Sequence, residues 1–340
     1  MVDAGVVSRE VQDPRIADYL LDRRGAAGRD LGIGPLSGDA STRRYYRITE
    51  KGRTSILALY PEPFDSEEMP FLAVGAMLAE WGLSIPAVLD HDGARGIVLL
   101  EDLGDLTLQG ALVGIEPRKR EDLYREALEQ LAQLQREAAH APRNAACFQV
   151  AFDVEKLSWE LHYFLRHFVE GYRGRQLTVE DRATLAEAFH RLSEEIASWP
   201  RVFCHRDCHS RNIMLRAGRL YWLDFQDARM GPATYDLASL LRDSYVELSE
   251  EFVNDRAEEF REKALPRETR ETFLRRFELM SVQRNLKALG TFGYMATVRR
   301  SDVYDRYVPG TLENARRNLA RHPEVAALRR ALGRHIEELA

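Results

Sequence analysis

A short strand-like stretch interrupts an otherwise helical half of this chain. From about residue 122 to the C-terminus, apolar residues recur at helical spacing over residues 122–140, 154–170, 180–198, 235–247 and most of 268–340. Between the third and fourth of these helices, residues 201–214 and 220–224 form short strand-and-loop segments joined by the turn Arg216-Ala217-Gly218. The sequence therefore predicts a mainly helical region built around one small hairpin.

The N-terminal part of the chain has a different pattern. It predicts helices at residues 15–24 and 66–81, and strands at 44–48, 54–60, 87–90 and 96–100. The turn Glu50-Lys51-Gly52 joins the first two strands as a hairpin. The character changes after residues 101–105. We expect an α+β fold with a small β-rich lobe at residues 1–101 and a larger helical lobe at residues 102–340.

Composition narrows the class of protein. A net charge of -6 argues against a nucleic-acid binder, whose surface is usually basic. No apolar run approaches the roughly 20 residues that cross a bilayer, and residues 1–13 lack the pattern of a secretory signal. Three cysteines fit reduced thiols better than a disulfide framework. We therefore expect a cytoplasmic protein with no nucleic-acid or membrane partner; nothing in the sequence indicates its oligomeric state.

The segment VFCHRDCHSRNIML, residues 202–215, allows two interpretations. Its Cys204, His205, Cys208 and His209 suggest a metal or haem site. Structural zinc usually takes two separated pairs of ligands, however, and Cys147 has no ligand near it to form a second pair. Haem attachment needs C-x-x-C-H, whereas three residues separate these cysteines. This interpretation predicts bound metal or a Soret band in purified protein.

The other interpretation is phosphoryl transfer. Asp207 is followed five positions later by Asn212, and Asp224 ends the next strand twelve residues further on. One loop can thereby direct a carboxylate to a hydroxyl nucleophile and an amide oxygen to a metal, and the hairpin brings Asn212 and Asp224 to the same side. Oxygen ligands of this kind suit Mg²⁺. The structural alternative is that Asp207 is a turn residue and Asp224 a helix N-cap.

The blocks FCHRDCHSRNIML and YWLDFQDARMGPATYDLASLL resemble the aminoglycoside phosphotransferase/choline kinase superfamily, which has a bilobal protein-kinase-like fold. Within it, the chain is most similar to the anomeric N-acetylmuramate/N-acetylglucosamine kinases of bacterial cell-wall recycling. LSGDASTRRYYRI, LLEDLGD and QRNLKALGTFGYM, at residues 36–48, 99–105 and 283–295, extend the resemblance over most of the chain. It implies an ATP- and Mg²⁺-dependent kinase with a nucleotide-binding lobe at residues 1–101 and a catalytic and substrate lobe at 102–340.

The resemblance also implies roles for single residues. Asp207 matches the catalytic base, and Asn212 and Asp224 match the magnesium ligands. Asp236 matches an aspartate that supports the catalytic loop, although it could equally be a first-turn helix residue. The nucleotide-contacting residues are implied to be Ser37, Gly38 and Asp39 in a covering loop, and Glu101 and Leu103 in a hinge whose backbone meets the adenine edge.

The chain departs from this pattern on the third strand. TSILALYPEP contains no lysine to pair with the phosphates, so Arg43, Arg44 or Arg211 is the candidate cation, and the pairing role of Glu80 is in doubt. The segment after Asp224 leaves no room for a long activation loop. A small hydroxylated acceptor is therefore favoured over a protein substrate.

The resulting hypothesis is ATP-dependent phosphorylation of the anomeric hydroxyl of N-acetylmuramate, N-acetylglucosamine or both. Arg242 or Arg284 could meet a lactyl carboxylate. One alternative is a kinase of another small alcohol: an aminoglycoside at acidic surfaces such as 247–251, or choline at rings such as Trp159 and Tyr163. The other is a nucleotide-binding pseudokinase scaffold, which the missing strand lysine motivates.

Overall fold

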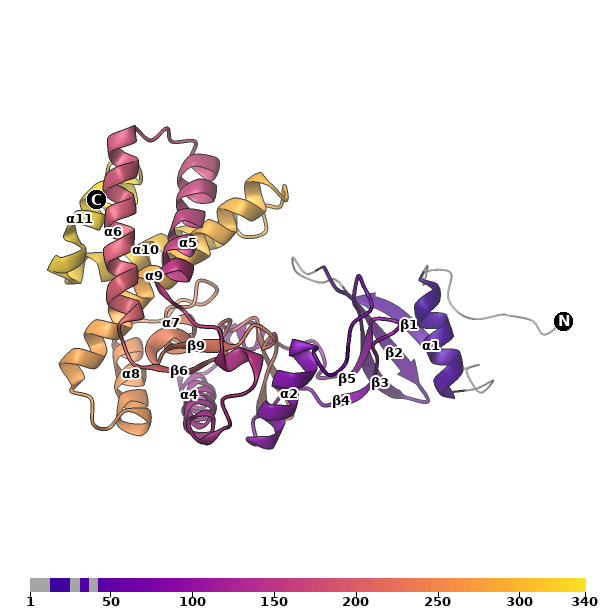
Figure 1. The fold of residues 1–340 in the computed structure, drawn as a ribbon. Coiled ribbons are helices and arrows are strands. Elements are labelled where there is room, and N and C mark those ends of the chain that lie inside the picture. Colours follow the sequence, from indigo (N-terminus) through magenta and orange to yellow (C-terminus); the bar gives the residue numbers. More distant parts are fainter. Residues whose placement is uncertain (1–12, 25–30, 37–41) are drawn as a thin grey trace. The chain divides into compact units, whose positions relative to one another are not determined.

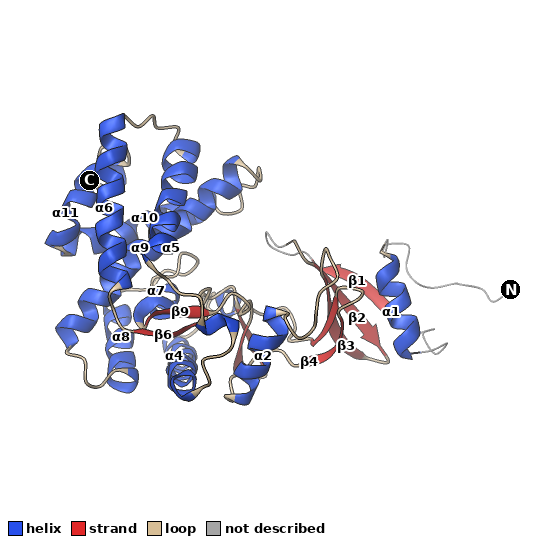
Figure 2. Ribbon diagram, viewed as in Figure 1, coloured by secondary structure: helices blue, strands red, loops and turns tan. Residues whose placement is uncertain are grey.

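The computed structural model describes residues 13–24, 31–36 and 42–340, and these form two compact units. The first unit contains Met1–Leu106 and Met214–Gln226, and the second contains Thr107–Ile213 and Asp227–Ala340. The first is built around a sheet, and the second is mainly helical (Figure 2).

The first unit has a five-stranded antiparallel sheet. Its strand order is β1 (Leu31–Leu36), β2 (Arg44–Glu50), β3 (Arg53–Leu59), β5 (Ile97–Glu101) and β4 (Val88–Asp92). Lys51 and Gly52, with φ of 47° and 76°, make the turn between β2 and β3, which confirms the predicted hairpin. β1 was not expected from the sequence, because it carries two glycines and Pro35, which are rare in strands and tolerated at a sheet edge.

Two helices accompany this sheet (Figure 1). α1 (Pro14–Arg24) covers it, and its buried Ile16, Tyr19 and Leu20 share one apolar cluster with Leu57 of β3. α2 (Pro70–Glu80) begins at a proline, whose missing N–H costs nothing at the first helical position. Phe71 of α2 stacks on Phe225 with ring centroids 4.8 Å apart.

A second hairpin belongs to the first unit although it lies far along the chain. It consists of β7 (Ile213–Arg216) and β8 (Arg219–Trp222), as the sequence predicted. The Trp222 N–H donates to the Ser84 carbonyl at 2.8 Å, and the Leu215 N–H donates to the Leu106 carbonyl at 2.8 Å. These bonds tie the hairpin to residues of the first unit. A lobe boundary after residue 101 therefore stays a prediction, since the compact units divide the chain at Leu106 and at both ends of this hairpin.

The second unit is a set of helices around a two-stranded sheet of β6 (Arg201–Cys204) and β9 (Arg229–Pro232). Its helices are α3 (Leu108–Ala111), α4 (Pro117–His140), α5 (Val154–Phe164), α6 (Val179–Ala197), α7 (Thr234–Leu241), α8 (Glu250–Ala264), α9 (Arg270–Thr297), α10 (Val308–Arg321) and α11 (Ala326–Gly333). Shorter helical segments are η2 (Ala146–Phe148), η3 (Leu165–Tyr172), η4 (Asp305–Tyr307), η5 (Pro323–Val325) and η6 (Glu337–Leu339).

The predicted helices are present, but several of their bounds differ: α2 begins at Pro70 rather than at residue 66, and α4 begins at Pro117 rather than at residue 122. The helix expected over 154–170 continues past α5 as the π-helix η3, and the one expected over 235–247 ends at Leu241. α9 is the central helix, with 28 residues. Gly290 and Gly293 let α5 and η3 cross it closely, because a Cβ on either would lie within 3 Å of backbone atoms of Phe164 or His167.

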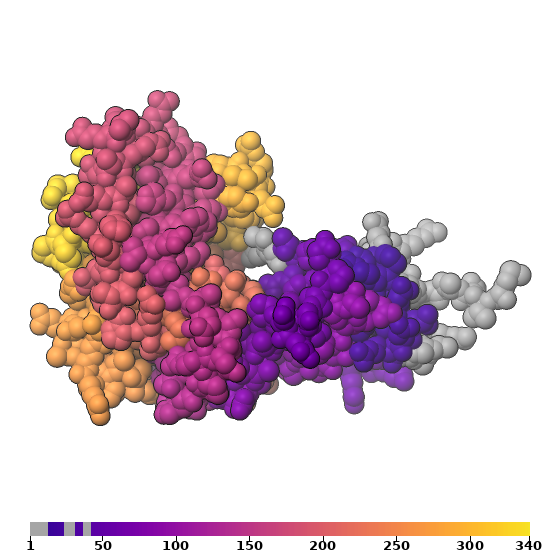
Figure 3. All heavy atoms as spheres, viewed as in Figure 1, coloured from indigo at the N-terminus to yellow at the C-terminus, as the bar shows by residue number. Residues whose placement is uncertain are grey.

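The α+β class predicted from the sequence is confirmed. No helix in the described ranges is long and apolar enough to cross a bilayer. In the all-atom view of Figure 3, side chains fill most of the space seen between the ribbons of the helical unit.

Candidate active site

The predicted site residues are divided between the two units. Asp207, Arg211 and Asn212 belong to the helical unit, whereas Arg43, Arg44, Glu101, Leu103 and Asp224 belong to the first. Ser37, Gly38 and Asp39 lie outside the described residues.

The loop that follows β6 is held in shape by Asp236 of α7. The Asp236 carboxylate is fully buried and accepts the backbone N–H of His205 at 2.6 Å and that of Arg206 at 2.9 Å. Arg206 has a φ of 83°, a left-handed conformation that costs energy for a residue with a side chain. Asp236 therefore stabilises the strained backbone just before Asp207, which agrees with the supporting role that the resemblance implied.

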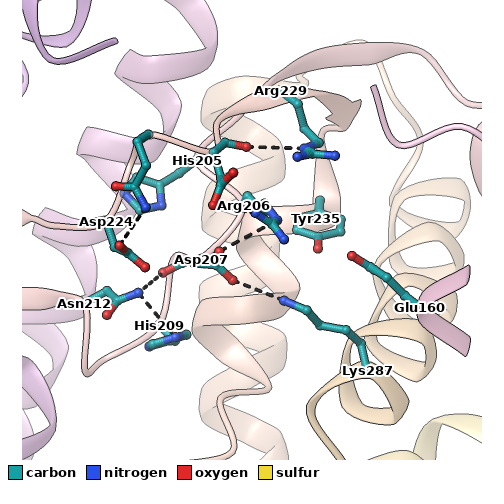
Figure 4. Close-up of polar contacts among 12 residues, drawn as sticks. Glu160, His205, Arg206, Asp207, His209, Asn212, Asp224, Arg229, Tyr235 and Lys287 are labelled. Atoms are coloured by element: carbon teal, nitrogen blue, oxygen red, sulfur yellow. Dashed lines mark hydrogen bonds and ion pairs between the residues drawn. The ribbon is translucent and has the colours of Figure 1, made fainter. Parts of the chain in front are cut away.

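Asp207 lies between two cations (Figure 4). Its Oδ1 is 3.2 Å from Nζ of Lys287 on α9, and its Oδ2 is 3.8 Å from Nε of Arg206. Burial raises the pKa of the Asp207 carboxyl, but the charges of Lys287, Arg206 and Arg284 outweigh it and hold that pKa well below its usual range. Asp207 is thus a carboxylate in a fixed position.

Asn212 is oriented by the same loop. Its side-chain Nδ2 donates to the Asp207 carbonyl at 3.0 Å, so the amide oxygen Oδ1 is directed away from this bond. The Ser210 N–H donates to the buried Asp243 carboxylate at 2.8 Å, which fixes the loop at a second point. One loop thus carries both the Asp207 carboxylate and the Asn212 amide, and the Asn212 side chain bonds the Asp207 backbone.

A pocket of about 110 Å³ opens beside Asp207 within the helical unit. Lys287, Thr291 and Phe292 of α9 line it, together with Ser239 of α7 and with His209 and Tyr245 of the neighbouring loops. The QRNLKALGTFGYM block thus supplies one wall. The His209 and Tyr245 rings are 5.1 Å apart, so the pocket combines aromatic surface with polar groups.

The two arginines considered for a lactyl carboxylate are both buried and paired. Arg284 lines the pocket, and its Nη1 donates to the Tyr235 hydroxyl at 2.7 Å. Arg242 also lines the pocket, but its Nη2 donates to Glu250 at 2.9 Å, and Nη1 bonds the same carboxylate. Arg242 is therefore less free than Arg284 to bind an anion.

In the first unit, Asp224 and Arg43 are brought together from sequence positions 181 apart. Asp224 Oδ1 accepts from Nη2 of Arg43 at 2.9 Å and from Nε2 of Gln226 at 2.9 Å. The Arg43 guanidinium also lies 5.8 Å from the centroid of the Tyr45 ring. Asp224 has a φ of 64° and is a second strained non-glycine residue at the predicted site. Arg43 thus pairs with the predicted metal ligand.

The other two candidate cations are engaged elsewhere. Arg44 forms an ion pair with Asp13, and the Arg211 guanidinium lies over the Tyr245 and Tyr304 rings at 5.0 and 5.3 Å from their centroids. Glu80, whose pairing with a strand lysine was in doubt, is exposed at the end of α2.

The predicted hinge is fixed by a contact that sequence reasoning missed. The Glu101 side chain bonds Arg216 and the Ala87 N–H, and Leu103 is buried. Between them, Asp102 accepts from Nε of Arg47 on β2 at 2.7 Å. Arg47 also reaches Asp105 at 2.8 Å, so one guanidinium holds both aspartates of LLEDLGD. No sequence rule relates Arg47 to Asp102 before the strands are paired.

Lys287 is the other site residue that the sequence did not single out. It lies 80 positions from Asp207. The QRNLKALGTFGYM block had been noted as a possible pocket wall, but a lysine in a long helix usually faces water. Here burial and the neighbouring Arg284 lower its pKa from the ordinary lysine value.

The cysteines have the surroundings of core residues. Cys204 and Cys208 are fully buried, and the Cys204 thiol lies 3.5 Å from the Pro232 carbonyl. Burial raises the pKa of both thiols well above the usual value, which disfavours the thiolate that a metal would need. Among the described residues no three His, Cys, Asp or Glu side chains are grouped as a metal site. Mg²⁺ bound with a nucleotide does not need such a group, because phosphates supply several of its ligands.

Comparison with known proteins relates this chain to phosphotransferases. The model of a family described as the phosphotransferase enzyme family matches residues 32–272. An N-acetylmuramate/N-acetylglucosamine kinase from Neisseria meningitidis serogroup B is 35% identical over 306 residues, covering 88% of this chain and 89% of that protein. A protein of the same name from Pseudomonas aeruginosa is 34% identical over 303 residues, covering 86% of each chain.

Solved structures with similar folds are more distant in sequence. An ADP-bound aminoglycoside phosphotransferase has a TM-score of 0.60 at 17% identity, covering 89% of this chain and 97% of its own. A choline/ethanolamine kinase family protein from Mesorhizobium loti has a TM-score of 0.58 at 17% identity, covering 95% and 99%. These likenesses confirm the predicted bilobal, protein-kinase-like α+β fold.

Proposed function

The chain belongs to the phosphotransferase enzyme family, and from that membership we propose that it is an ATP-dependent kinase of the anomeric hydroxyl of N-acetylmuramate and N-acetylglucosamine. The observation that carries this proposal is the Asp207 carboxylate, held 3.2 Å from Lys287 beside a pocket in the helical unit. The named relatives, at 34–35% identity over most of both chains, support the choice of acceptor.

In the proposed reaction, Asp207 receives the hydrogen bond of the acceptor hydroxyl and takes its proton as the γ-phosphoryl group is transferred. The new bond joins the sugar oxygen to phosphorus, and the bond to the ADP oxygen breaks. Because its pKa is held low, Asp207 acts more by orienting the hydroxyl than as a strong base, which suits a loose transition state. Lys287 then neutralises part of the charge beside the transferring group.

The nucleotide and metal are assigned to residues that match their chemistry. Asn212 Oδ1 and the Asp224 carboxylate would hold Mg²⁺, which offsets charge on the phosphates when bound. Arg43 is the cation best suited to replace the missing strand lysine, because it already pairs with Asp224 at 2.9 Å. Ser37, Gly38 and Asp39 would cover the phosphates, and the backbone around Glu101 and Leu103 would meet the adenine edge. ATP use is consistent with the cytoplasm as the site of the reaction.

The pocket favours an N-acetylated amino sugar over the alternative alcohols. Lys287 and Arg284 line it, and both would repel a polycation such as an aminoglycoside or a quaternary ammonium such as choline. The carboxylates that also line it are in use, since Asp207 is paired with Lys287 and Asp243 caps backbone N–H groups. A neutral or anionic sugar avoids this repulsion.

The experiment is ADP release with Mg²⁺-ATP across a panel of N-acetylmuramate, N-acetylglucosamine, glucosamine, choline and an aminoglycoside. Asp207→Asn is the matched control, and phosphorus NMR identifies the linkage. We expect turnover of the two N-acetyl sugars with an acid-labile anomeric phosphate. Turnover of choline or the aminoglycoside alone would reassign the acceptor. ATP binding without turnover of any acceptor would favour the pseudokinase scaffold.

A further inference from the structure

Four aromatic side chains of the helical unit lie together and take no part in the proposed reaction. They are Trp159 and Tyr163 of α5, His167 of η3 and Tyr294 of α9, called here the aromatic platform. The Trp159 and Tyr163 rings are stacked at 5.3 Å, Tyr163 and His167 are 4.3 Å apart, and His167 and Tyr294 meet edge-on at 5.2 Å. Trp159 is 55% exposed, so the platform is not simply part of the core.

The platform continues one face of α9 away from Asp207. Lys287 and Thr291 line the pocket, and Tyr294 follows Thr291 at the i+3 position, where side chains of a helix are neighbours. Seven residues of helix place Tyr294 about 10 Å beyond Lys287 along the axis. Tyr163 of α5 joins this face because Gly290 lets the two helices approach, with Tyr163 Cδ1 only 3.1 Å from an added Cβ.

The charges around the platform indicate what kind of ligand it suits. Nζ of Lys156 lies 4.2 Å from the centroid of the Trp159 ring and would repel a second cation there. Burial and the nearby Arg166 lower the pKa of His167, which disfavours its charged form. Trp159 is the exposed ring of the platform, and Tyr163 and Tyr294, whose ring centroids are 6.0 Å apart, contribute hydroxyl groups beside it. Such a surface fits an uncharged molecule with one apolar face and hydroxyl groups at its edge, as a pyranose has.

We propose that the aromatic platform is a second sugar subsite, which stacks the next pyranose of an oligosaccharide whose reducing-end sugar occupies the pocket. The proposal rests on the proposed function. If the anomeric hydroxyl meets Asp207, the O4 atom on the opposite side of the ring is directed away from the reaction. A sugar linked through O4 then extends outward, and the α9 face leads from the pocket to Tyr294 in that direction.

The first test is kinetic. N-acetylglucosamine and its β-1,4-linked disaccharide are compared as acceptors for wild type, Trp159→Ala and Trp159→Phe. We expect Trp159→Ala to raise the KM of the disaccharide about fivefold and to change that of the monosaccharide less than about twofold, with Trp159→Phe in between. Leu21→Ala, which removes an exposed apolar side chain of α1, controls for nonspecific effects and should change neither KM. Equal KM changes for both sugars, or none, would overturn the proposal.

The second test does not depend on turnover. Tryptophan fluorescence is titrated with the disaccharide, and the Trp159→Phe variant assigns the signal among the four tryptophans. A saturable change that disappears in Trp159→Phe supports the platform, and its absence in wild type refutes it. If wild type phosphorylates neither sugar, the proposed function fails, and this titration still decides whether the platform binds a sugar.

Discussion

The Asp207 carboxylate lies beside two cations, and this arrangement decides how it can act. Replacing it by asparagine keeps the size of the side chain but removes its charge and its capacity to accept a proton. We expect Asp207→Asn to lower kcat by about 10²- to 10⁴-fold, with the KM for ATP little changed. Steady-state kinetics with N-acetylglucosamine measure this. An Asn variant that keeps more than a tenth of the wild-type kcat would contradict the assignment of Asp207 as the base.

Lys287 tests whether the cation beside Asp207 matters to the reaction. Lys287→Met keeps the length and apolar stem of the side chain and removes its charge, which lies 3.2 Å from Oδ1 of Asp207. We expect kcat to fall by about tenfold or more, and Lys287→Arg to recover part of the loss because it restores the charge. If the Lys287→Met and Lys287→Arg variants lose the same kcat, Lys287 acts through packing, and its proposed electrostatic role is wrong.

The residues of the site differ in how far the sequence could predict them. Asp207 and Asn212 share one loop, so their spacing alone indicated a common site, and the structure brings them together. Lys287 and Arg47 contact their carboxylate partners across 80 and 55 positions. Such pairs depend on helix and strand packing, which local spacing does not reveal. Choosing Arg43 over Arg44 likewise required the side-chain directions at the start of β2.

At the scale of elements, Glu250 at the start of α8 joins three helices. It accepts hydrogen bonds from Arg242 at the end of α7 and from Arg317 and Arg321 of α10. The side chain of Arg242 is 1% exposed, so removing its partner leaves a buried positive charge. We expect Glu250→Gln to lower the free energy of unfolding at pH 7 by about 2–4 kcal/mol. Urea unfolding measures this free energy, and Glu251→Gln, at an exposed position of the same helix, is the control.

The same pair predicts a pH dependence. Hydrogen bonds from Arg242, opposed by burial and aided by Arg321, lower the pKa of Glu250 to about 2 from an ordinary value of 4.5. Because the folded-state pKa is the lower one, this stabilisation is complete above pH 4.5 and is lost as pH falls towards 2. The difference in unfolding free energy between wild type and Glu250→Gln should therefore shrink to roughly half or less from pH 7 to pH 3. A difference that stays constant would remove the ion pair as its cause.

At the scale of the whole molecule, the sequence predicted the α+β class and most elements, since periodicity is a local property. It did not predict β1, whose glycines and proline give no strand pattern. It also gave no reason to group residues 214–226 with the N-terminal strands. Contacts such as Phe71 with Phe225 and Trp222 with Ser84 join segments more than 100 residues apart, so only the folded chain shows them.

This grouping predicts how the molecule opens. Leu57 of β3 is fully buried in the first unit, and Leu57→Ala should destabilise that unit by about 2–5 kcal/mol. Native-state hydrogen exchange should then speed up at the Leu215 and Trp222 amides, which bond within the same unit, and stay unchanged at the amides of α9. The matched variant Leu286→Ala, in the buried part of α9, should speed up exchange at the α9 amides and leave the Leu215 and Trp222 amides unchanged. If the hairpin amides follow Leu286→Ala instead, residues 214–226 open with the helical unit, and the division into units is wrong at the hairpin.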